Sequence, residues 1–488
     1  MTKYRSTPDQ NLKGMPSGVP FIIGNELAER FSFYGMKGIL VTFMTLHMLN
    51  AMGESANMTE SEAKAWYHAF TGLAYTFPIL GALVADVFWG KYKTILIISL
   101  MYCVGHACLA VMDYAPAMGM GMKPWLLAGM LFIAIGAGAI KSCVSAHVGD
   151  QFGSGNKRLL AIVFNWFYFS INVGAAVSNL LTPKLLEGIK IGTDTQTGEA
   201  IVFGGPWIAF GLPGVLMALA TFVFWLGRNK FIHVPPAGWQ KFKQETFSPE
   251  GIQALKSLAP LFVVFVMMFW AIFDQTGSAW VLQARQMDRN FLGVEWLEAQ
   301  IQFVNPILIL TGIPFFAYVV YPLMGKFFDP TPLRKIGIGF VLAALAFAIS
   351  AWIESQIQSG KTPNIGWQFV AYLVLTAAEI LVSIVCLEFA YTQSPPKMKS
   401  FVMGIYFLGV AVGNYFAMGV NWVLESTKNA EGQTLLEGAN YYWFFAAMMM
   451  ITFFAYLVFA KYFYKGRVYI QGEATITARA EAEAPDAR

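Results

Sequence analysis

Charged residues inside a long apolar segment most constrain what this chain can fold into. Glu26, Glu29 and Arg30 lie in the first long segment of the chain, which is otherwise apolar. A charge at membrane depth costs roughly 2.5–3.5 kcal/mol per residue, so it is tolerated where charges pair or face water inside a helix bundle. Arg30 follows Glu26 by four residues, and Tyr34 and Lys37 continue the same helical face. Charges of both signs and a tyrosine on one face favour a lined pathway over a structural ion pair between two helices.

Apolar stretches of membrane-spanning length recur along the whole chain. Of its 488 residues, 56% are hydrophobic and 13% are charged, whereas soluble proteins carry about 25% charged residues. A span needs roughly 20 apolar residues, and such stretches lie near 20–49, 65–89, 93–113, 124–148, 159–184, 204–227, 257–284, 297–324, 334–354, 366–391, 399–424 and 440–464. Spanning segments that lack the alternation of a barrel are helices. The sequence therefore predicts an all-α membrane protein with twelve transmembrane helices.

Other function classes lack their sequence signals. The four cysteines have no paired spacing, the five histidines form no ligand pair, and no glycine-rich phosphate loop occurs. We therefore expect no metal, no cofactor and no enzymatic activity. No basic run or basic-aromatic array predicts nucleic-acid binding.

Loop charges predict the orientation, and a polar centre predicts the domains. Most Lys and Arg residues fall in loops on one side of the predicted spans, so both termini are expected to be cytoplasmic. The central polar segment divides the spans six and six. The predicted division is an N-terminal tail, a six-helix bundle, a cytoplasmic linker, a second six-helix bundle and a C-terminal tail, at 1–18, 19–228, 229–256, 257–466 and 467–488.

Two six-helix halves joined by a cytoplasmic linker are the architecture of a major facilitator transporter. In that fold the substrate binds between the halves, near the middle of the membrane. Asp86 and Lys91 lie in the short loop after the second predicted span. An acidic residue followed by basic ones in that loop resembles the gating motif of these transporters.

The motifs of this chain are similar to those of one family of such transporters. Residues 25–35 read NELAERFSFYG and match the motif ExxERFxxYG of the proton-coupled oligopeptide transporters. The resemblance continues, in order, through GALVAD at 81–86, GAGAIK at 136–141, FYFSINVG at 167–174, FWAIFDQTGS at 269–278 and LEFAY at 387–391. The chain is thus identified as a member of that family.

Loop lengths and further motifs indicate the branch of the family. The linker at 229–256 has no room for the two extra helices of many bacterial members, and the loop at 354–365 is too short for the external domain of animal members. WYHAF at 66–70, FDQ at 273–275 and VNP at 304–306 nevertheless resemble the animal transporters. The chain resembles a compact relative of the animal type.

The resemblance implies a site for a zwitterionic peptide. Lys37 and Lys141 match family positions for the peptide carboxylate, and Arg30 is a third cation nearby. Glu388 matches the position for the amino group. The same predicted helix carries Glu379, nine residues earlier, to which no role is assigned.

Broad peptide specificity requires contacts to the peptide backbone. Asn172 and Asn305 match family positions that hydrogen-bond the backbone amides. Tyr34, Tyr75 and Trp270 match positions that shape the side-chain pockets.

Proton coupling needs a group whose charge changes with its partner. Glu26 or Glu29 is one candidate, because a substrate carboxylate that recruits Arg30 would release it to take up a proton. His68 is the second, because histidine titrates near neutrality and the residue matches a coupling position of animal relatives. Asp274 is expected at a gate or proton path of the second half.

These expectations combine into one functional prediction. The chain is predicted to be a symporter that imports di- and tripeptides with protons by alternating access. Its partners would be small peptides, protons and the lipid bilayer of the cell membrane, with one chain as the functional unit. Two alternatives stay open: a carrier of nitrate or another small anion, which would not need Glu388, and a peptide sensor that does not transport.

Overall fold

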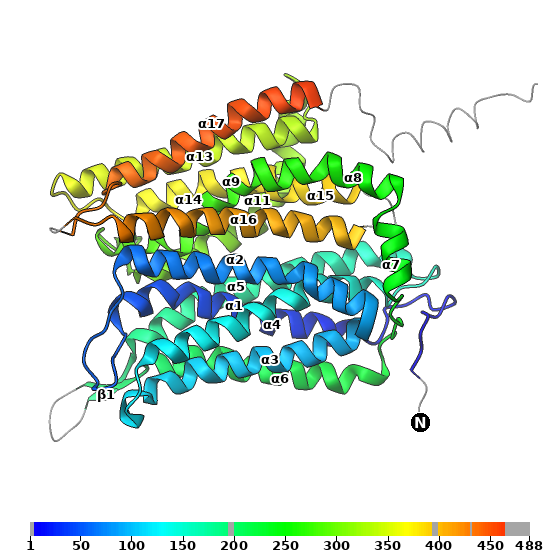
Figure 1. Cartoon of the computed structure of the whole chain (residues 1–488), viewed down its shortest axis with the longest axis horizontal. Helices are drawn as coiled ribbons and strands as arrows, with labels where there is room; N and C mark the ends of the chain where they lie inside the picture. Colours follow the sequence, from blue (N-terminus) through cyan, green and yellow to red (C-terminus); the bar gives the residue numbers. More distant parts are fainter. Residues whose placement is uncertain (1–3, 194–199, 393–398, 430–431, 464–488) are drawn as a thin grey trace, which may run out of the picture.

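Long helices that run side by side make up most of the molecule (Figure 1). The computed structural model describes residues 4–193, 200–392, 399–429 and 432–463. Within these ranges, eleven helical segments are long and apolar enough to cross a membrane. Helix α1 (Val19–Leu46) has 28 residues, which is within the range of these segments. It differs from them in carrying four buried charged residues, Glu26, Glu29, Arg30 and Lys37. With α1 as the remaining span, the predicted all-α architecture of twelve transmembrane helices is confirmed.

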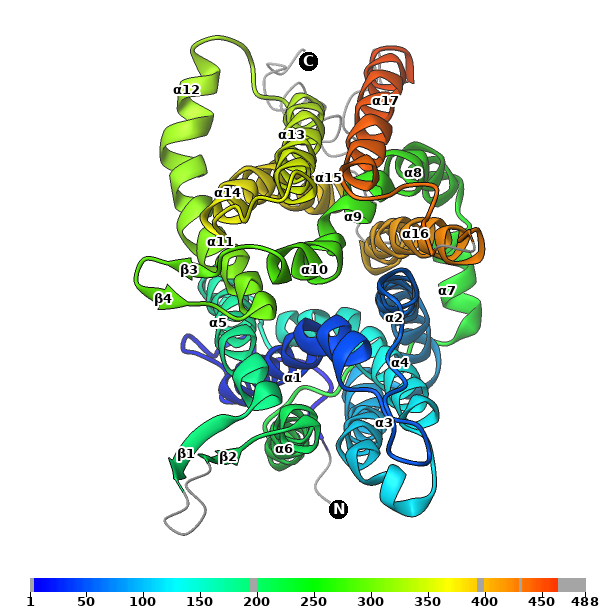
Figure 2. The same ribbon diagram turned by 90° about the vertical axis from the view of Figure 1, so that its left-hand side faces the viewer.

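The first six spans pack around one apolar core, which extends from Val19 to Phe231 and includes Leu282 of the second half. After α1, these spans are built on α2 (Glu60–Val84), α3 (Lys91–Val111), α4 (Met122–Gly149), α5 (Leu160–Glu187) and α6 (Pro206–Leu226). Seen end-on, they form the lower half of the molecule (Figure 2). We call this group the first bundle.

The last six spans surround a separate core, from Leu258 to Tyr456. Their regular parts are α9 (Met267–Phe273), α10 (Ala279–Arg285), α11 (Val304–Phe315), α12 (Tyr321–Gly325), α13 (Pro332–Gln358), α14 (Gly366–Glu379), α15 (Val385–Thr392), α16 (Lys399–Ser426) and α17 (Ala439–Phe463). This second bundle forms the upper half in Figure 2. Helix α2 lies along α16, and α5 contacts α11, so these pairs join the bundles.

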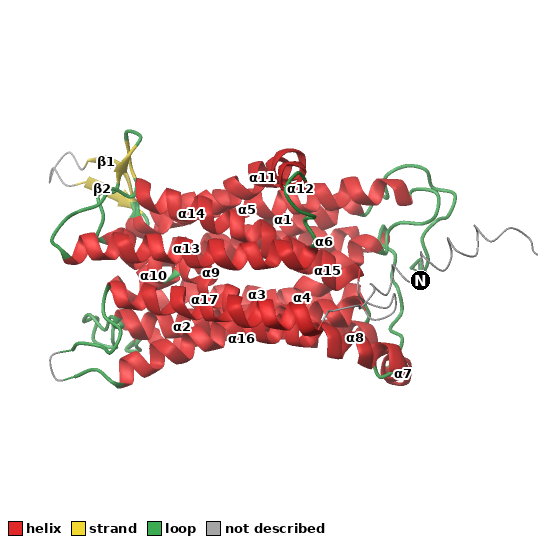
Figure 3. Ribbon diagram, turned by 90° about the horizontal axis from the view of Figure 1, so that it is seen from above, coloured by secondary structure: helices red, strands yellow, loops and turns green. Residues whose placement is uncertain are grey.

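The connections define two ends of the molecule. Two short helices, α7 (Trp239–Thr246) and α8 (Pro249–Pro260), lie between the bundles at the end that we call the linker end (Figure 1). At the opposite end, strands β1 (Ile189–Thr193) and β2 (Ala200–Phe203) form a hairpin, which gives the hairpin end its name. A second small hairpin joins β3 (Asn290–Phe291) to β4 (Val294–Glu295). The sequence analysis predicted neither hairpin. Figure 3 distinguishes helices, in red, from strands, in yellow.

Two irregular helical segments in the second bundle lie at or next to polar residues. The seventh span changes to a 3₁₀ segment at Asp274–Gly277 between α9 and α10. A Cβ on Gly277 would clash with the hydroxyl of Tyr67, so a glycine there lets the broken helix approach α2. A π-helical segment, Ile380–Ile384, directly follows Glu379 at the end of α14. Such segments occur frequently at functional sites.

Close packing of α2 on α4 yields a stability prediction. A Cβ on Gly81 would clash with the carbonyl oxygen of Ala139, and backbone cannot move aside as a side chain can. We expect Gly81→Val to destabilise the protein by about 3 kcal/mol, at the upper end of overpacking costs, and to lower its melting temperature in detergent. Gly24→Val is the matched control, because Gly24 is exposed and nothing lies within 4 Å of a Cβ built there. Equal melting temperatures for the two variants would contradict this packing.

Candidate functional site

Arg30 holds the two acidic residues of the predicted polar face. Its Nε lies 2.6 Å from Glu26 Oε1 and 3.2 Å from Glu29 Oε2, and all three side chains are buried. Gly174 of α5 lets this part of α1 pack closely, because a Cβ there would lie 2.7 Å from the carbonyl oxygen of Leu27. The cluster belongs wholly to the first bundle, so its charges compensate one another without the second bundle.

A chain of buried polar contacts crosses from the first bundle to the second. Lys37 Nζ lies 2.7 Å from Asp274 Oδ1. Asn414 of α16 donates from Nδ2 to Asp274 Oδ2 at 2.8 Å, and its Oδ1 lies 2.9 Å from His68 Nδ1. His68 Nε2 lies 3.0 Å from Ser278 Oγ. The broken seventh span supplies both Asp274 and Ser278.

Lys141 has a buried ammonium group without a hydrogen-bond partner among the described residues. Nζ lies 4.0 Å from the ring centroid of Tyr75 and 4.3 Å from that of Phe33. Arg30 and Lys37 are close enough to repel it electrostatically, and Glu29 and Asp274 are close enough to attract it. Helix α4 thus brings a third cation to this region, and aromatic faces are its nearest partners.

Glu379 is the carboxylate that the second bundle brings to the same region. Asn305 of α11 donates to Glu379 Oε2 at 2.7 Å and to Thr376 Oγ1 at 3.1 Å. Tyr34 is within electrostatic range of Glu379 across the bundle interface, and also of Arg30 on its own helix. Glu379 therefore lies on the side of the second bundle that faces Tyr34 of α1.

Glu388, the residue expected to hold the peptide amino group, has a different setting. It is exposed and lies close enough to interact electrostatically with Tyr321. The π-helical segment separates it from Glu379, and the two carboxylates point to different surroundings. Glu379 is within electrostatic range of Tyr34 on α1, whereas Glu388 is exposed.

The remaining predicted contact residues lie around this region in different settings. Tyr75 is partly buried beside Lys141, and its ring centroid lies 6.0 Å from that of Phe407. Trp270 is 8% exposed, and its Nε1 has no hydrogen-bond partner among the described residues. Asn172 donates to the carbonyl oxygen of Tyr168 on its own helix at 3.0 Å.

The predicted gating residues lie at the linker end, within the first bundle. Lys91 Nζ pairs with Asp150 Oδ2 at 2.8 Å. Asp86 is partly buried, and its backbone carbonyl accepts a hydrogen bond from Ala237 N at 2.7 Å. Through that bond the linker is attached to the first bundle, next to the Lys91 ion pair.

Hydrogen bonds between the bundles concentrate toward the hairpin end. Gln302 Nε2 donates to Gly38 O at 2.9 Å, and Gln300 Nε2 donates to Leu180 O at 2.8 Å. Arg285 donates to Thr45 Oγ1 at 3.1 Å. Within the described ranges, the contact of this kind farthest toward the linker end is Thr76 with Tyr415, at 2.9 Å. The structure is therefore held closed at the hairpin end.

Sequence reasoning missed several members of the site. Asn414 had a detectable signal, because it is a completely buried amide within an apolar span, and such residues usually have a functional or pairing role. Glu298, which pairs with Arg289 at 2.8 Å and with Arg285 at 3.4 Å, lies too near a predicted span end to stand out. Glu379 lies on the opposite face of its helix from Glu388, because nine residues of a helix turn by about two and a half turns.

Two packed groups of six spans with buried charges along their interface define a class of protein. The site contains no cluster of acidic, histidine and cysteine residues that could hold a metal among the described residues. Its charges instead face one another across two bundles whose contacts are concentrated at one end. This is the architecture of a major facilitator transporter.

Comparisons with known proteins give the family. The family model described as "POT family" matches residues 92–248 and 239–444. Peptide transporter family 1 of Drosophila melanogaster is 38% identical over 374 residues, which cover 70% of this chain and 48% of that protein. Solute carrier family 15 member 2 of Mus musculus is 35% identical over 412 residues, which cover 77% and 54%. The chain spans about half the length of these curated relatives.

Solved structures agree with this relationship. The crystal structure of an auto-inhibited POT family peptide transporter has a TM-score of 0.78 and 31% identity, covering 93% of this chain and 98% of that one. An in meso crystal structure of another POT family transporter has a TM-score of 0.78 and 30% identity, covering 93% and 99%. This chain belongs to the POT family. The predicted family and fold are confirmed, and a family of transporters agrees with the prediction that the chain is not an enzyme.

Proposed function

We propose that this protein carries short peptides across a membrane together with protons. The observation that carries the proposal is the Lys141 ammonium of the first bundle, which has no hydrogen-bond partner among the described residues. The second bundle directs the Glu379 carboxylate toward Tyr34 of the first bundle. A di- or tripeptide has a carboxylate and an ammonium at its two ends. It would therefore supply the missing partner of Lys141 and a cation for Glu379 in one molecule.

The polar side chains around these two charges suit a peptide backbone. Asn305 already binds Glu379, so it would orient that carboxylate and offer its amide to the substrate. Asn172 would provide a second amide from α5. Tyr34, Tyr75 and Trp270 supply aromatic surface, which tolerates different peptide side chains because it makes few directional contacts.

The cross-bundle chain from Lys37 to Ser278 is the proposed link between protons and conformation. If Asn414 Oδ1 accepts from His68 Nδ1, then neutral Nε2 accepts a hydrogen bond from Ser278. Protonation of His68 makes Nε2 a donor, so Ser278 must reorient. Protonation of Asp274 removes the charge that holds Lys37. Loss of the Lys37–Asp274 ion pair weakens the closure of the hairpin end. Reorientation of Ser278 transmits the charge of His68 to the same broken span.

The Arg30 cluster is the second proposed proton site. A substrate carboxylate that draws Arg30 away would leave Glu26 and Glu29 as two buried carboxylates with less compensation. Protonation of one of them would then be favoured, because buried charges of like sign disfavour each other's ionised form. This coupling links peptide binding directly to proton uptake.

Alternating access would exchange closure at the hairpin end for closure at the linker end. With both termini on the cytoplasmic side of the cell membrane, as the loop charges predict, the present structure would be the state that is closed to the outside. We propose the two bundles, with the boundaries predicted from sequence, as the moving units of a single functional chain. The predicted C-terminal tail at 467–488 lies outside the described residues.

A carrier of nitrate or another small anion is the alternative that the cations alone would allow. A small anion would not bind Glu379, because that carboxylate would repel it. Asn305 donates a hydrogen bond to Glu379, which is within electrostatic range of Tyr34. A peptide sensor would bind but would not need the proton-linked contacts between the bundles. The pairing of cations with one opposed carboxylate therefore favours the peptide transporter.

Uptake by purified protein in proteoliposomes tests this function. We expect a labelled dipeptide to accumulate when an inward proton gradient and a negative interior potential are applied, and not to accumulate without them. Lys141→Ala is expected to abolish this uptake, because the peptide carboxylate loses its free cation. His68→Ala or Glu29→Gln should remove gradient-driven accumulation while dipeptide exchange continues.

Lys123→Gln is the control for loss of a lysine, because Lys123 lies at the hairpin end, with its side chain 50% exposed, in a pair with Glu62. Uptake of nitrate without uptake of the dipeptide would refute the proposed substrate and leave the fold unaffected.

A further inference from the structure

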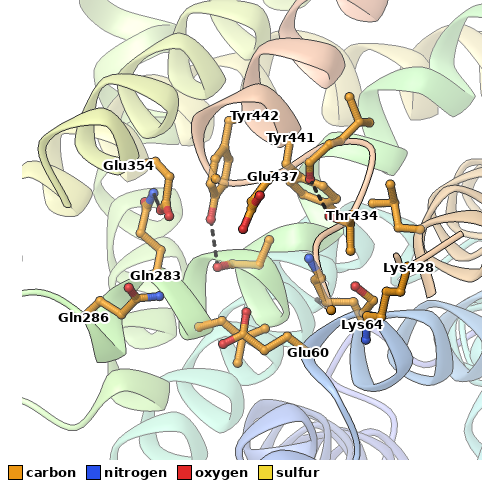
Figure 4. Close-up of a pocket in the computed structure, with 17 residues that line it drawn as sticks. Glu60, Lys64, Gln283, Gln286, Glu354, Lys428, Thr434, Glu437, Tyr441 and Tyr442 are labelled. Carbon is orange, nitrogen blue, oxygen red and sulfur yellow. Dashed lines mark hydrogen bonds between the residues drawn. The ribbon is translucent and has the colours of Figure 1, made fainter. Parts of the chain in front are cut away.

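A cavity lies between the bundles at the hairpin end, and we call it the second cavity because it is separate from the proposed peptide site. Its volume is about 290 Å³, at the small end of the roughly 300–1,000 Å³ of ligand pockets. The first bundle contributes Glu60 and Lys64 from the start of α2. The second bundle contributes Gln283, Glu354 and Tyr441, among others (Figure 4).

The basic residues lie on one side of this cavity, and Glu354 lies on the other (Figure 4). Lys64 Nζ lies 4.0 Å from the centroid of the Tyr441 ring. In the described part of the chain, no carboxylate is within ion-pair distance of it, although Glu60 and Glu354 interact with it electrostatically. Lys428, on the same side, is already paired with Glu425 at 2.6 Å. Lys64 is therefore the cation with capacity for an anion.

The carboxylate of Glu354 could bind a cation. Its exposed fraction is 9%, and Gln283 donates to Oε2 at 2.8 Å. Among the described residues no lysine or arginine forms an ion pair with it. Opposite charges thus face one cavity without pairing with each other. Since a partly buried charge without a counter-charge is unfavourable, a molecule that carries both charges would stabilise both residues.

We propose that this cavity binds a small zwitterion, of the size of an amino acid or a short peptide. The ligand carboxylate contacts Lys64, and the ligand ammonium contacts Glu354. Glu60 strengthens the acidic character of the cavity, and Tyr441 covers the apolar part of the ligand. The site is distinct from the one at Lys141 and Glu379, and its existence does not depend on the proposed transport.

Because both bundles line the cavity, the ligand binds one conformation in preference to the other. Opening the hairpin end separates Lys64 on α2 from Glu354 on α13, so the site is complete only in the closed state. A ligand with such differential affinity shifts the population toward that state. If the protein transports as proposed, the bound zwitterion therefore inhibits transport without competing at the central site.

Calorimetry with 6-aminohexanoate and the full chain in detergent tests the site. The central site is first disabled by Lys141→Gln with Glu379→Gln, so that remaining binding reports the second cavity. We expect saturable binding in this background, and at least tenfold weaker binding after the further change Lys64→Gln or Glu354→Gln. Lys123→Gln is the matched control and should leave the affinity unchanged. Hexanoate and hexylamine, which carry one charge each, should bind at least tenfold more weakly.

Two results would overturn the proposal. One is the absence of saturable binding in the background with the disabled central site. The other is an affinity that neither Lys64→Gln nor Glu354→Gln changes. Melting temperatures show which variants fold, and the two single changes are independent, so loss of folding in one leaves the other decisive. Failure of dipeptide uptake in proteoliposomes would refute the transport function but not this site.

Discussion

Glu379→Gln is expected to reduce dipeptide uptake by roughly 10- to 100-fold, whereas Glu388→Gln should leave it within about twofold. The hydrogen bonds of a charged group contribute about 1.5–3 kcal/mol, and about 1.4 kcal/mol corresponds to a factor of ten. Glu379 lies across the bundle interface from Tyr34 on the polar face of α1, while Glu388 is exposed on the same span. Initial rates over a range of dipeptide concentrations measure the effect.

Glu388→Gln is a closely matched control, because it makes the same chemical change nine residues away. The apparent affinity for a dipeptide should fall in Glu379→Gln, and the affinity for a peptide with a blocked amino group should change little. A larger loss in Glu388→Gln than in Glu379→Gln would contradict the assignment and support the expectation from the sequence.

Asp274→Ala is expected to shift the protein away from the conformation closed at the hairpin end. Removing one partner of a buried ion pair costs about 3–5 kcal/mol, and here the Lys37–Asp274 pair joins the two bundles. The cost therefore falls mainly on the closed state. Spin labels at Met52 and Leu435, which are 80% and 77% exposed, should report a longer distance in the variant, with the four native cysteines replaced.

Glu62→Gln is the control for that measurement, because it breaks the ion pair with Lys123 at the same end but within the first bundle. It should leave the distance between the labels unchanged. Lys37→Gln combined with Asp274→Asn should restore part of the closed population, since neither charge is then left buried alone. A distance that Asp274→Ala does not change would refute the role of this pair in closure.

The sequence was most informative where a charged residue lies within an otherwise apolar span. Glu26, Glu29 and Arg30 stand out because charge in an apolar span is costly, and the structure pairs them with one another. Lys141 was selected by its motif position, and its ammonium is without a hydrogen-bond partner among the described residues. Such residues are detectable locally, because their cost does not depend on which helix lies opposite.

Which residues meet across the interface was beyond sequence reasoning. Lys37 and Asp274 were both candidates, but their 2.7 Å contact joins residues on helices far apart in the chain. Glu379 and Glu388 lie nine residues apart and so on opposite faces of one span, but the sequence does not show which face meets the first bundle. Motif resemblance selected Glu388, and in the structure Glu379 is the residue within electrostatic range of Tyr34 on α1.

The sequence alone therefore determined the number of spans, the division into two halves and the location of the first polar face. These follow from apolar length and from the cost of buried charge, which are properties of short segments. The tertiary structure decided that the hairpin end is closed, that His68 is linked through Asn414 to Asp274, and that a second charged cavity lies between α2 and the second bundle. These features are contacts between distant segments, so only the packing of the two bundles creates them.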